Sequence, residues 1–283
     1  MSVESIAPGG ASHELVQLRP AGRASLDAFI ALLARDVYVI RKTFSMFLLR
    51  TVMQPLLTVF VFTYVFPKVG QGIGGRQGEA AFSTLFLPGA IATACIFQGI
   101  QAVALPLVQE FGYTREIDDR VLAPLPVWGV ALGKIASGAV QAVLAGVVVF
   151  PLAKFIPATP VRLDFNWPLL LTIGPLVCFT GAALGLAIGT RADTRQVPLI
   201  FSVIVVPMTF LGATYYPWAR LTPIAWLKYL VLVNPLVYMS EGLRASLTGI
   251  PHMSLLAIYV ALVGFGAVLA YLGISGFRKR VIS

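Results

Sequence analysis

The stretch MTFLGATYYPWARLTPIAWLKYLVLVNPLVYMSEGLRASLTG, residues 208–249, is the part of the chain that best indicates its fold. It is too hydrophobic for an ordinary loop, but prolines and charges interrupt it too often for a helix that crosses a bilayer, which needs about 20 apolar residues. Two shorter apolar runs, residues 222–233 and 236–247, are separated by Asn234 and Pro235. Runs of this length are typical of re-entrant segments. We therefore expect two short helices that enter the membrane from one side and return to that side.

The composition is that of a polytopic membrane protein. The chain has 283 residues, of which 58% are hydrophobic and 12% charged, whereas soluble domains carry about 25% charged residues. The formal net charge is +9, but the Lys and Arg residues flank apolar stretches and do not form a basic domain. We therefore expect contact with anionic membrane lipids and no nucleic-acid partner.

The amino-terminal region divides into a tail and an amphipathic helix. Residues 1–24 contain charges, prolines and glycines without an apolar core, so we expect a flexible cytosolic tail and no cleaved signal peptide. Ser25 can cap a helix over residues 25–45, in which apolar residues recur at steps of three and four. We expect this helix to lie in the inner membrane interface. The alternative is that it forms the cytosolic end of the first membrane helix.

Six stretches are long and apolar enough to cross the bilayer: residues 46–66, 82–105, 128–150, 167–189, 197–216 and 254–274. If the amino terminus is cytosolic, 14 of the 21 Lys and Arg residues lie on the cytosolic side, and the positive-inside rule places both termini there. A seventh crossing within residues 217–250 would put the basic tail, residues 277–283, outside. The sequence thus predicts an all-α polytopic membrane protein with six transmembrane helices, a preceding amphipathic helix, and a re-entrant helix pair between helices 5 and 6. The transmembrane domain covers residues 46–276.

Small residues form a strip within the fourth predicted span. Gly181, Gly185 and Gly189 recur every four residues and share one helix face. Such a strip lets another helix approach closely. The sequence leaves two partners open, a helix of the same chain or a helix of a second subunit.

Several chemistries lack the residues that they need. The interiors of the spans hold essentially no ionisable side chains, which ion-coupled transporters require. The nearest approach to a phosphate-binding loop, GVALGKI at residues 129–135, is one residue short and lacks the hydroxyl after the Lys. No G-x-S-x-G or H-E-x-x-H motif occurs. We therefore expect no catalytic residue, cofactor or metal site on this chain, and an energy source in a partner protein.

The densest charge cluster is an inner loop, QEFGYTREIDDR at residues 109–120, followed by VLAPLPVWGVALGK. A solvated loop is one interpretation. The other is a short helix that docks into a groove of a soluble partner, with the charges fixing its orientation.

Two regions resemble the permease subunits of ABC-2 type exporters, a family that includes daunorubicin-resistance and nodulation-factor export permeases. DDRVLAPLPVWGVALGK resembles the family's coupling helix and the start of its third span, and VPMTFLGATYYPWARLTP with VNPLVYMSEGLR resembles its signature between spans 5 and 6. The resemblance implies a coupling segment over residues 108–127 and a re-entrant exit gate around residues 217–250. The implied contacts to the ATPase are Glu110, Arg115, Glu116, Asp119 and Arg120. The implied gate residues are Phe210, Tyr216, Pro217, Asn234, Pro235, Glu241 and Arg244.

The resemblance also implies the partners and the task. Two permease subunits, the second a copy or a paralogue, would form a path above two cytosolic ATPase subunits that hold ATP and Mg, in the cytoplasmic membrane of a bacterium. The implied substrate is an amphiphile, such as a drug, lipid, glycolipid or lipid-linked saccharide. An intramembrane enzyme that modifies lipids and a channel or scaffold protein are the alternatives. Because Glu241 and Arg244 share a helix face, we expect either a polar pair at the exit or two charges that face lipid headgroups.

Overall fold

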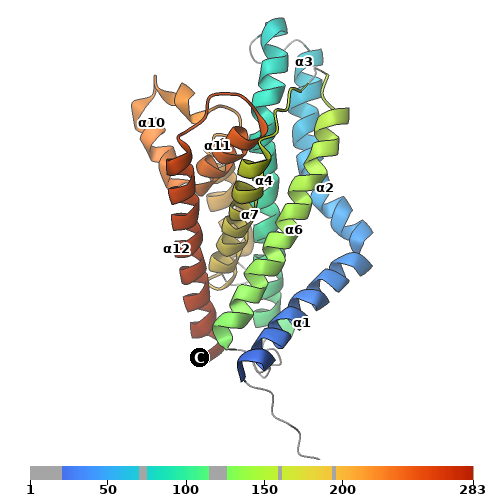
Figure 1. Ribbon diagram of the computed structural model, residues 1–283, viewed down its shortest axis with the longest axis vertical. Helices are drawn as coiled ribbons and strands as arrows, with labels where there is room; N and C mark the ends of the chain where they lie inside the picture. The colour runs from blue at the N-terminus through green and yellow to red at the C-terminus, as the bar shows by residue number, and fades with distance from the viewer. Residues whose placement is uncertain (1–20, 70–74, 115–125, 159–160, 193–195, 283) are drawn as a thin grey trace, which may run out of the picture.

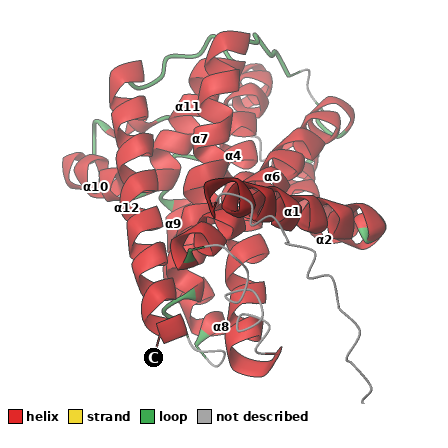
Figure 2. Ribbon diagram, turned by 60° about the horizontal axis from the view of Figure 1, so that its bottom comes forward, coloured by secondary structure: helices red, strands yellow, loops and turns green. Residues whose placement is uncertain are grey.

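The computed structural model describes residues 21–69, 75–114, 126–158, 161–192 and 196–282. Every regular element within these ranges is helical (Figure 2). Five helical stretches are long and apolar enough to cross a membrane: Phe44–Lys68, Phe82–Gly112, Val127–Phe155, Trp167–Gly189 and Leu255–Val281. They coincide with the first four and the last of the expected spans. The prediction of an all-α membrane protein is therefore confirmed for this part of the chain.

The fifth expected span is broken into short pieces. It consists of α8 (Val197–Ile200), a π-helical turn (Phe201–Val205) and α9 (Val206–Phe210), which have four, five and five residues. Pro207 lacks the backbone N–H that would bond to the carbonyl four residues earlier, in the π-helical turn, which favours such an interruption. These pieces together are shorter than the about 20 residues that a crossing needs. The fifth transmembrane helix, and with it the total of six, stays a prediction.

The amino-terminal helix is separate from the first membrane helix. α1 (Ala21–Lys42) ends at Thr43, whose backbone leaves the helical conformation, and α2 (Phe44–Phe60) then turns away from it (Figure 1). α2 continues as a π-helical turn (Val61–Val65) and α3 (Phe66–Lys68). This bend favours a distinct helix over a straight extension of the first span. Ser25 lies inside α1 and does not cap it, because the alanines and Arg23 before it also favour a helix.

The long helix α4 (Gly75–Gln109) is the centre of the bundle. It packs against α6 (Val127–Phe155), α7 (Trp167–Gly189) and α11 (Pro235–Leu247), and it continues into a π-helical turn (Glu110–Thr114). Its apolar window is 67% buried, more than that of any other membrane-length helix described. The last helix, α12 (Leu255–Ile282), packs against α7, α6 and α11. The elements at both ends of the molecule are thus connected through α4.

The small-residue strip of α7 faces α4. A Cβ atom added to Gly185 would lie 2.7 Å from the carbonyl oxygen of Gly99, and one added to Gly189 would lie 2.9 Å from the Cα atom of Ala104. Gly181 likewise faces the backbone of α4. Of the two partners that the sequence left open, the structure shows a helix of the same chain. The two backbones approach each other here with no side chain between them.

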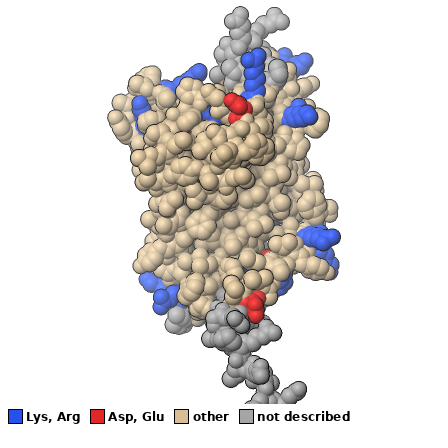
Figure 3. Space-filling view, viewed as in Figure 1, with Lys and Arg blue, Asp and Glu red and all other residues tan. Residues whose placement is uncertain are grey.

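The molecule has two distinct ends. α1 and the carboxyl terminus lie at the lower end of Figure 1, whereas α3, α10 (Ala225–Leu230) and α11 lie toward the upper end. Lys and Arg side chains gather toward the two ends of the face in Figure 3, with an uncharged band between them. This arrangement agrees with the expectation that both termini lie on one side and the short helix pair on the other. Which side is cytosolic stays a prediction.

Candidate functional site

Two short helices occupy the segment that the sequence singled out. α10 continues as a 3₁₀ turn (Val231–Val233), and α11 begins at Pro235. Asn234 makes the break. Its side-chain oxygen accepts a hydrogen bond from the Leu236 N–H at 2.9 Å and caps α11, while its amide nitrogen donates to the Met208 carbonyl at 2.7 Å. The Asn-Pro step therefore starts α11 and also ties it to α9.

The centre of this region is a buried ion pair. Arg244 donates to the carboxylate of Glu241 at 2.6 Å, and both residues lie on α11, three positions apart. The same carboxylate accepts hydrogen bonds from two backbone N–H groups, those of Trp218 at 2.9 Å and Met253 at 2.8 Å. Glu241 thus joins α11 to the 3₁₀ turn Trp218–Leu221 and to the segment before α12.

Arg244 joins α11 to two further segments. Its guanidinium donates to the carbonyl of Ala213 at 3.0 Å and reaches the carbonyl of Leu85, on α4, at 3.5 Å. Ala213 has a φ angle of +53°, a conformation that non-glycine residues adopt only where the surroundings enforce it. Close packing holds this turn in place, because a Cβ atom added to Gly89 of α4 would lie 2.5 Å from the backbone of Thr214.

The burial of both side chains shows whether the ion pair can contact lipid headgroups. The side chains of Arg244 and Glu241 are 0% and 1% exposed, so neither faces lipid headgroups or an open surface in this structure. Burial lowers the pKa of Arg244, and the charge of Glu241 opposes that shift. The expectation of a shared helix face is confirmed, but headgroup contact was wrong.

The other residues expected in the gate differ in exposure. Phe210 is 59% exposed, and its carbonyl accepts a hydrogen bond from the Tyr216 hydroxyl at 3.4 Å. Pro217 and Pro235 are buried at the starts of the 3₁₀ turn Trp218–Leu221 and of α11. Their role in an exit gate stays a prediction.

The base of the expected coupling segment lies at the opposite end of the bundle. Glu110, the first residue after α4, is buried and accepts a hydrogen bond at 2.5 Å from Lys134 on α6. Glu110 therefore pairs inside the bundle, and its direct contact with an ATPase stays a prediction.

Aromatic and cationic contacts fix the same base to α12. The ring of Phe111 lies 5.8 Å from that of Phe277, and the guanidinium of Arg280 lies 4.9 Å from the Phe111 ring centroid. Arg280 also donates to the carbonyls of Gly189 and Ala192, at the end of α7. The remaining expected coupling residues, Arg115, Glu116, Asp119 and Arg120, lie outside the described residues.

Comparison with known families shows to which family the chain belongs. The family model of the ABC-2 type transporter matches residues 27–248. The chain belongs to the ABC-2 type transporter family. This ABC-2 chain is also 26% identical over 220 residues to the inner membrane transport permease YadH of Escherichia coli K12 and of Shigella flexneri, which covers 76% of this chain and 82% of each relative.

Family membership gives the coarse function and the kind of partner. The ABC-2 chain is the membrane subunit of an ABC transporter, lies in the cytoplasmic membrane, and has an ABC ATPase as its implied partner. Within the described residues, no group of three or more His, Cys, Asp or Glu side chains is placed to hold a metal ion.

Proposed function

We propose that this chain is the permease subunit of an ATP-driven exporter that moves an amphiphilic substrate outward across the cytoplasmic membrane. Separate subunits, two per transporter, would bind ATP and Mg and hydrolyse the ATP. Two permease chains, identical or paralogous, would enclose the path. In this proposal both termini are cytosolic, α1 lies in the inner interface, and α10 and α11 form a re-entrant pair that shapes the outer exit.

The observation that carries this proposal is the course of α4. Its lower end leads directly to Glu110, which pairs with Lys134, and its upper part supplies the Leu85 carbonyl to Arg244. Between Leu85 and Glu110 lie roughly 37 Å of helix at 1.5 Å per residue. One continuous rod therefore joins the base of the coupling segment to the α11 ion pair.

A mechanism follows from these contacts. Closure of the ATPase subunits on ATP would displace the segment over residues 108–127. The Glu110–Lys134 pair would pass this displacement to α6, and the contact of Phe111 with Phe277 would pass it to α12. Since α4 is held by Arg244 at the other end, its tilt would move α11 and the turn at Ala213 together.

The lining of a small cavity supports the proposal that the substrate is an amphiphile. The cavity encloses about 70 Å³ between α2, α4 and the α9 turn, and its walls combine apolar side chains with the neutral polar groups of Gln54, Thr93 and Thr214. The Thr93 and Thr214 hydroxyls lie 3.2 Å apart. Neutral hydrogen-bonding groups among apolar ones suit an uncharged part of an amphiphile better than a bare ion.

The experiment compares Lys134→Met with Lys42→Met, which removes an exposed charge near the same end. Each permease variant is purified with its ATPase and reconstituted in proteoliposomes, and substrate export and ATP hydrolysis are measured together. We expect Lys134→Met to retain the ATPase but to export about tenfold less substrate per ATP, while Lys42→Met matches wild type. Wild-type export per ATP by Lys134→Met contradicts the proposed transmission. Transport that proceeds without ATP identifies a channel instead.

A further inference from the structure

A lateral groove runs between α6 and α7, away from the ion pair and the coupling base. Its cavity encloses about 250 Å³ and is lined almost entirely by apolar side chains. Val143, Val147 and Phe150 form the α6 wall, and Leu171 and Gly174 belong to the α7 wall. At about 30 Å³ for a water-sized group, the cavity has room for roughly eight methylene-sized groups.

The groove is open toward the surrounding bilayer and is closed on its inner side. Val147 and Leu171, on opposite walls, are 56% and 70% exposed, so a molecule in the surrounding bilayer can enter between them. The buried thiols of Cys95 and Cys178 line the cavity at its inner side. A Cβ atom added to Gly174 would meet no other heavy atom within 4 Å. The width of the groove at this point therefore depends on the absence of a side chain.

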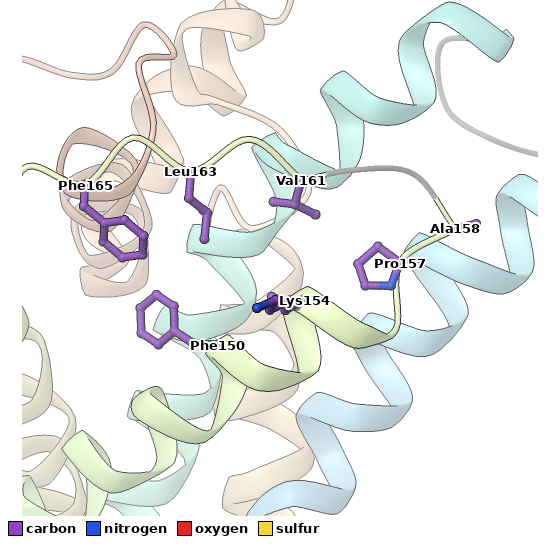
Figure 4. Close-up of a pocket in the computed structure, with 8 residues that line it drawn as sticks. Phe150, Lys154, Pro157, Ala158, Val161, Leu163 and Phe165 are labelled. Carbon is purple, nitrogen blue, oxygen red and sulfur yellow. The ribbon is translucent and has the colours of Figure 1, made fainter.

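The ammonium group of Lys154 lies at the upper end of the groove. Val143, Val147, Phe150 and Lys154 follow one another at helical steps of four, three and four, so they share one face of α6. Phe150 lines both the apolar cavity and a second cavity of about 600 Å³. Figure 4 shows Lys154 between Phe150 and Pro157 in that second cavity, with Leu163 and Phe165 on the segment opposite.

The charge of Lys154 is available to a ligand. Within the described part of the chain Lys154 makes no ion pair, and its ammonium lies 5.9 Å from the ring centroid of Phe155. Asp164, a nearby carboxylate, lines the adjoining cavity beyond Phe165. Phe165 stacks on Trp167 at 5.3 Å, a pair of rings typical of the level at which the hydrocarbon meets the headgroups.

We propose that the α6–α7 groove binds one acyl chain of an anionic phospholipid of the bilayer, whose headgroup rests against Lys154. The apolar cavity accepts the upper part of the chain, and the ammonium pairs with the phosphate. The side opening explains how the lipid enters without any movement of the helices. This inference does not depend on the direction of transport or on the exit gate.

The test measures lipid retention by the purified full-length chain in a neutral detergent, by native mass spectrometry. The probes are phosphatidylglycerol and phosphatidylcholine with identical acyl chains. Because one basic residue near a membrane surface contributes an about fivefold preference for an anionic lipid, we expect wild type to bind phosphatidylglycerol about fivefold more tightly. Lys154→Ala should abolish the preference, whereas Lys68→Ala, an exposed lysine at the same end, should leave it unchanged.

A second pair of variants tests the groove itself. Gly174→Leu fills it and should weaken binding of both lipids about tenfold or more. Gly264→Leu is the matched control, since a Cβ there also meets nothing within 4 Å but lies on the outer face of α12. Val147→Trp fills the groove from its exposed rim, so it separates blockage from misfolding.

Four results overturn the proposal. Equal retention of the two lipids by wild type refutes the headgroup contact. Equal loss in Gly174→Leu and Gly264→Leu, or no loss in Val147→Trp, refutes the groove. Recovery of a cellular amphiphile that phosphatidylglycerol does not displace from wild type, and that Gly174→Leu fails to retain, assigns the groove to the transported substrate instead of a bilayer lipid.

Discussion

Substitutions of the two partners of the buried ion pair on α11 should lower the stability of the protein by different amounts. Glu241→Gln leaves the guanidinium of Arg244 buried without a counter-charge, whereas Arg244→Met leaves a carboxylate that still accepts from two backbone N–H groups, those of Trp218 and Met253. Glu241→Gln is therefore expected to be the more harmful change.

The magnitudes follow from the burial of both partners. Removing one partner of a buried ion pair typically lowers the free energy of unfolding by about 3–5 kcal/mol. At about 2–4 °C per kcal/mol, Glu241→Gln should lower the midpoint of thermal unfolding by about 10 °C. Arg244→Met should lower it by about half as much. The double variant Glu241→Gln/Arg244→Met has no buried charge and should be more stable than Glu241→Gln alone, by about 2 kcal/mol.

The two native cysteines can serve as probes of unfolding in this measurement. Cys95 and Cys178 are both buried, so a maleimide that fluoresces on reaction reports unfolding in detergent without further labels. Each variant is heated with the dye, and the midpoints are compared. A midpoint for Glu241→Gln within about 2 °C of wild type, or strictly additive losses in the double variant, refutes the view that this pair joins α11 to four other segments.

Three further predictions follow from individual contacts. Asn234→Ala removes the cap of α11 and the bond to α9, so the free energy of unfolding should fall by about 2 kcal/mol in the same thiol assay; an unchanged midpoint counts against that role. Gly185→Leu forces a side chain into the α4 backbone and should yield little monodisperse protein on size-exclusion chromatography, unlike Gly264→Leu. Without the native cysteines, exposed His252→Cys should react with an impermeant maleimide outside intact cells and buried Ser246→Cys should not; labelling of His252→Cys only in opened cells contradicts the topology.

The elements that local sequence governs could be predicted. Five long apolar stretches became five long helices, and Asn234 with Pro235 separated α10 from α11 because capping and the missing proline N–H act within a few residues. The fifth expected span stays a prediction, because the structure divides it into three short helical pieces. Hydropathy counts its side chains, whereas Pro207 interrupts the hydrogen bonds of its backbone.

Contacts between distant segments could not be predicted from spacing. The repeat of Gly181 and Gly185 indicated a close approach but carried no information about which helix would approach. Similarly, three residues of separation placed Glu241 and Arg244 on one face, yet their burial depends on the turn at Ala213, far away along the chain. Glu110 and Lys134 lie 24 positions apart, so no local pattern indicated that they form a pair.

The glycine strip of α7 also determines where this molecule can change shape. Where backbones touch, as Gly185 does with α4, there is no layer of side chains that could slip into a second packing arrangement. α2 meets α4 differently, through side chains, among them the buried Val59 and the hydrogen-bonded pairs Thr51 with Gln98 at 3.1 Å and Arg50 with Gln101 at 3.2 Å. During a transport cycle α4 and α7 would thus move as one rigid block, and the protein would open at the contact between α2 and α4. Substitutions that speed or slow opening should therefore lie at this contact.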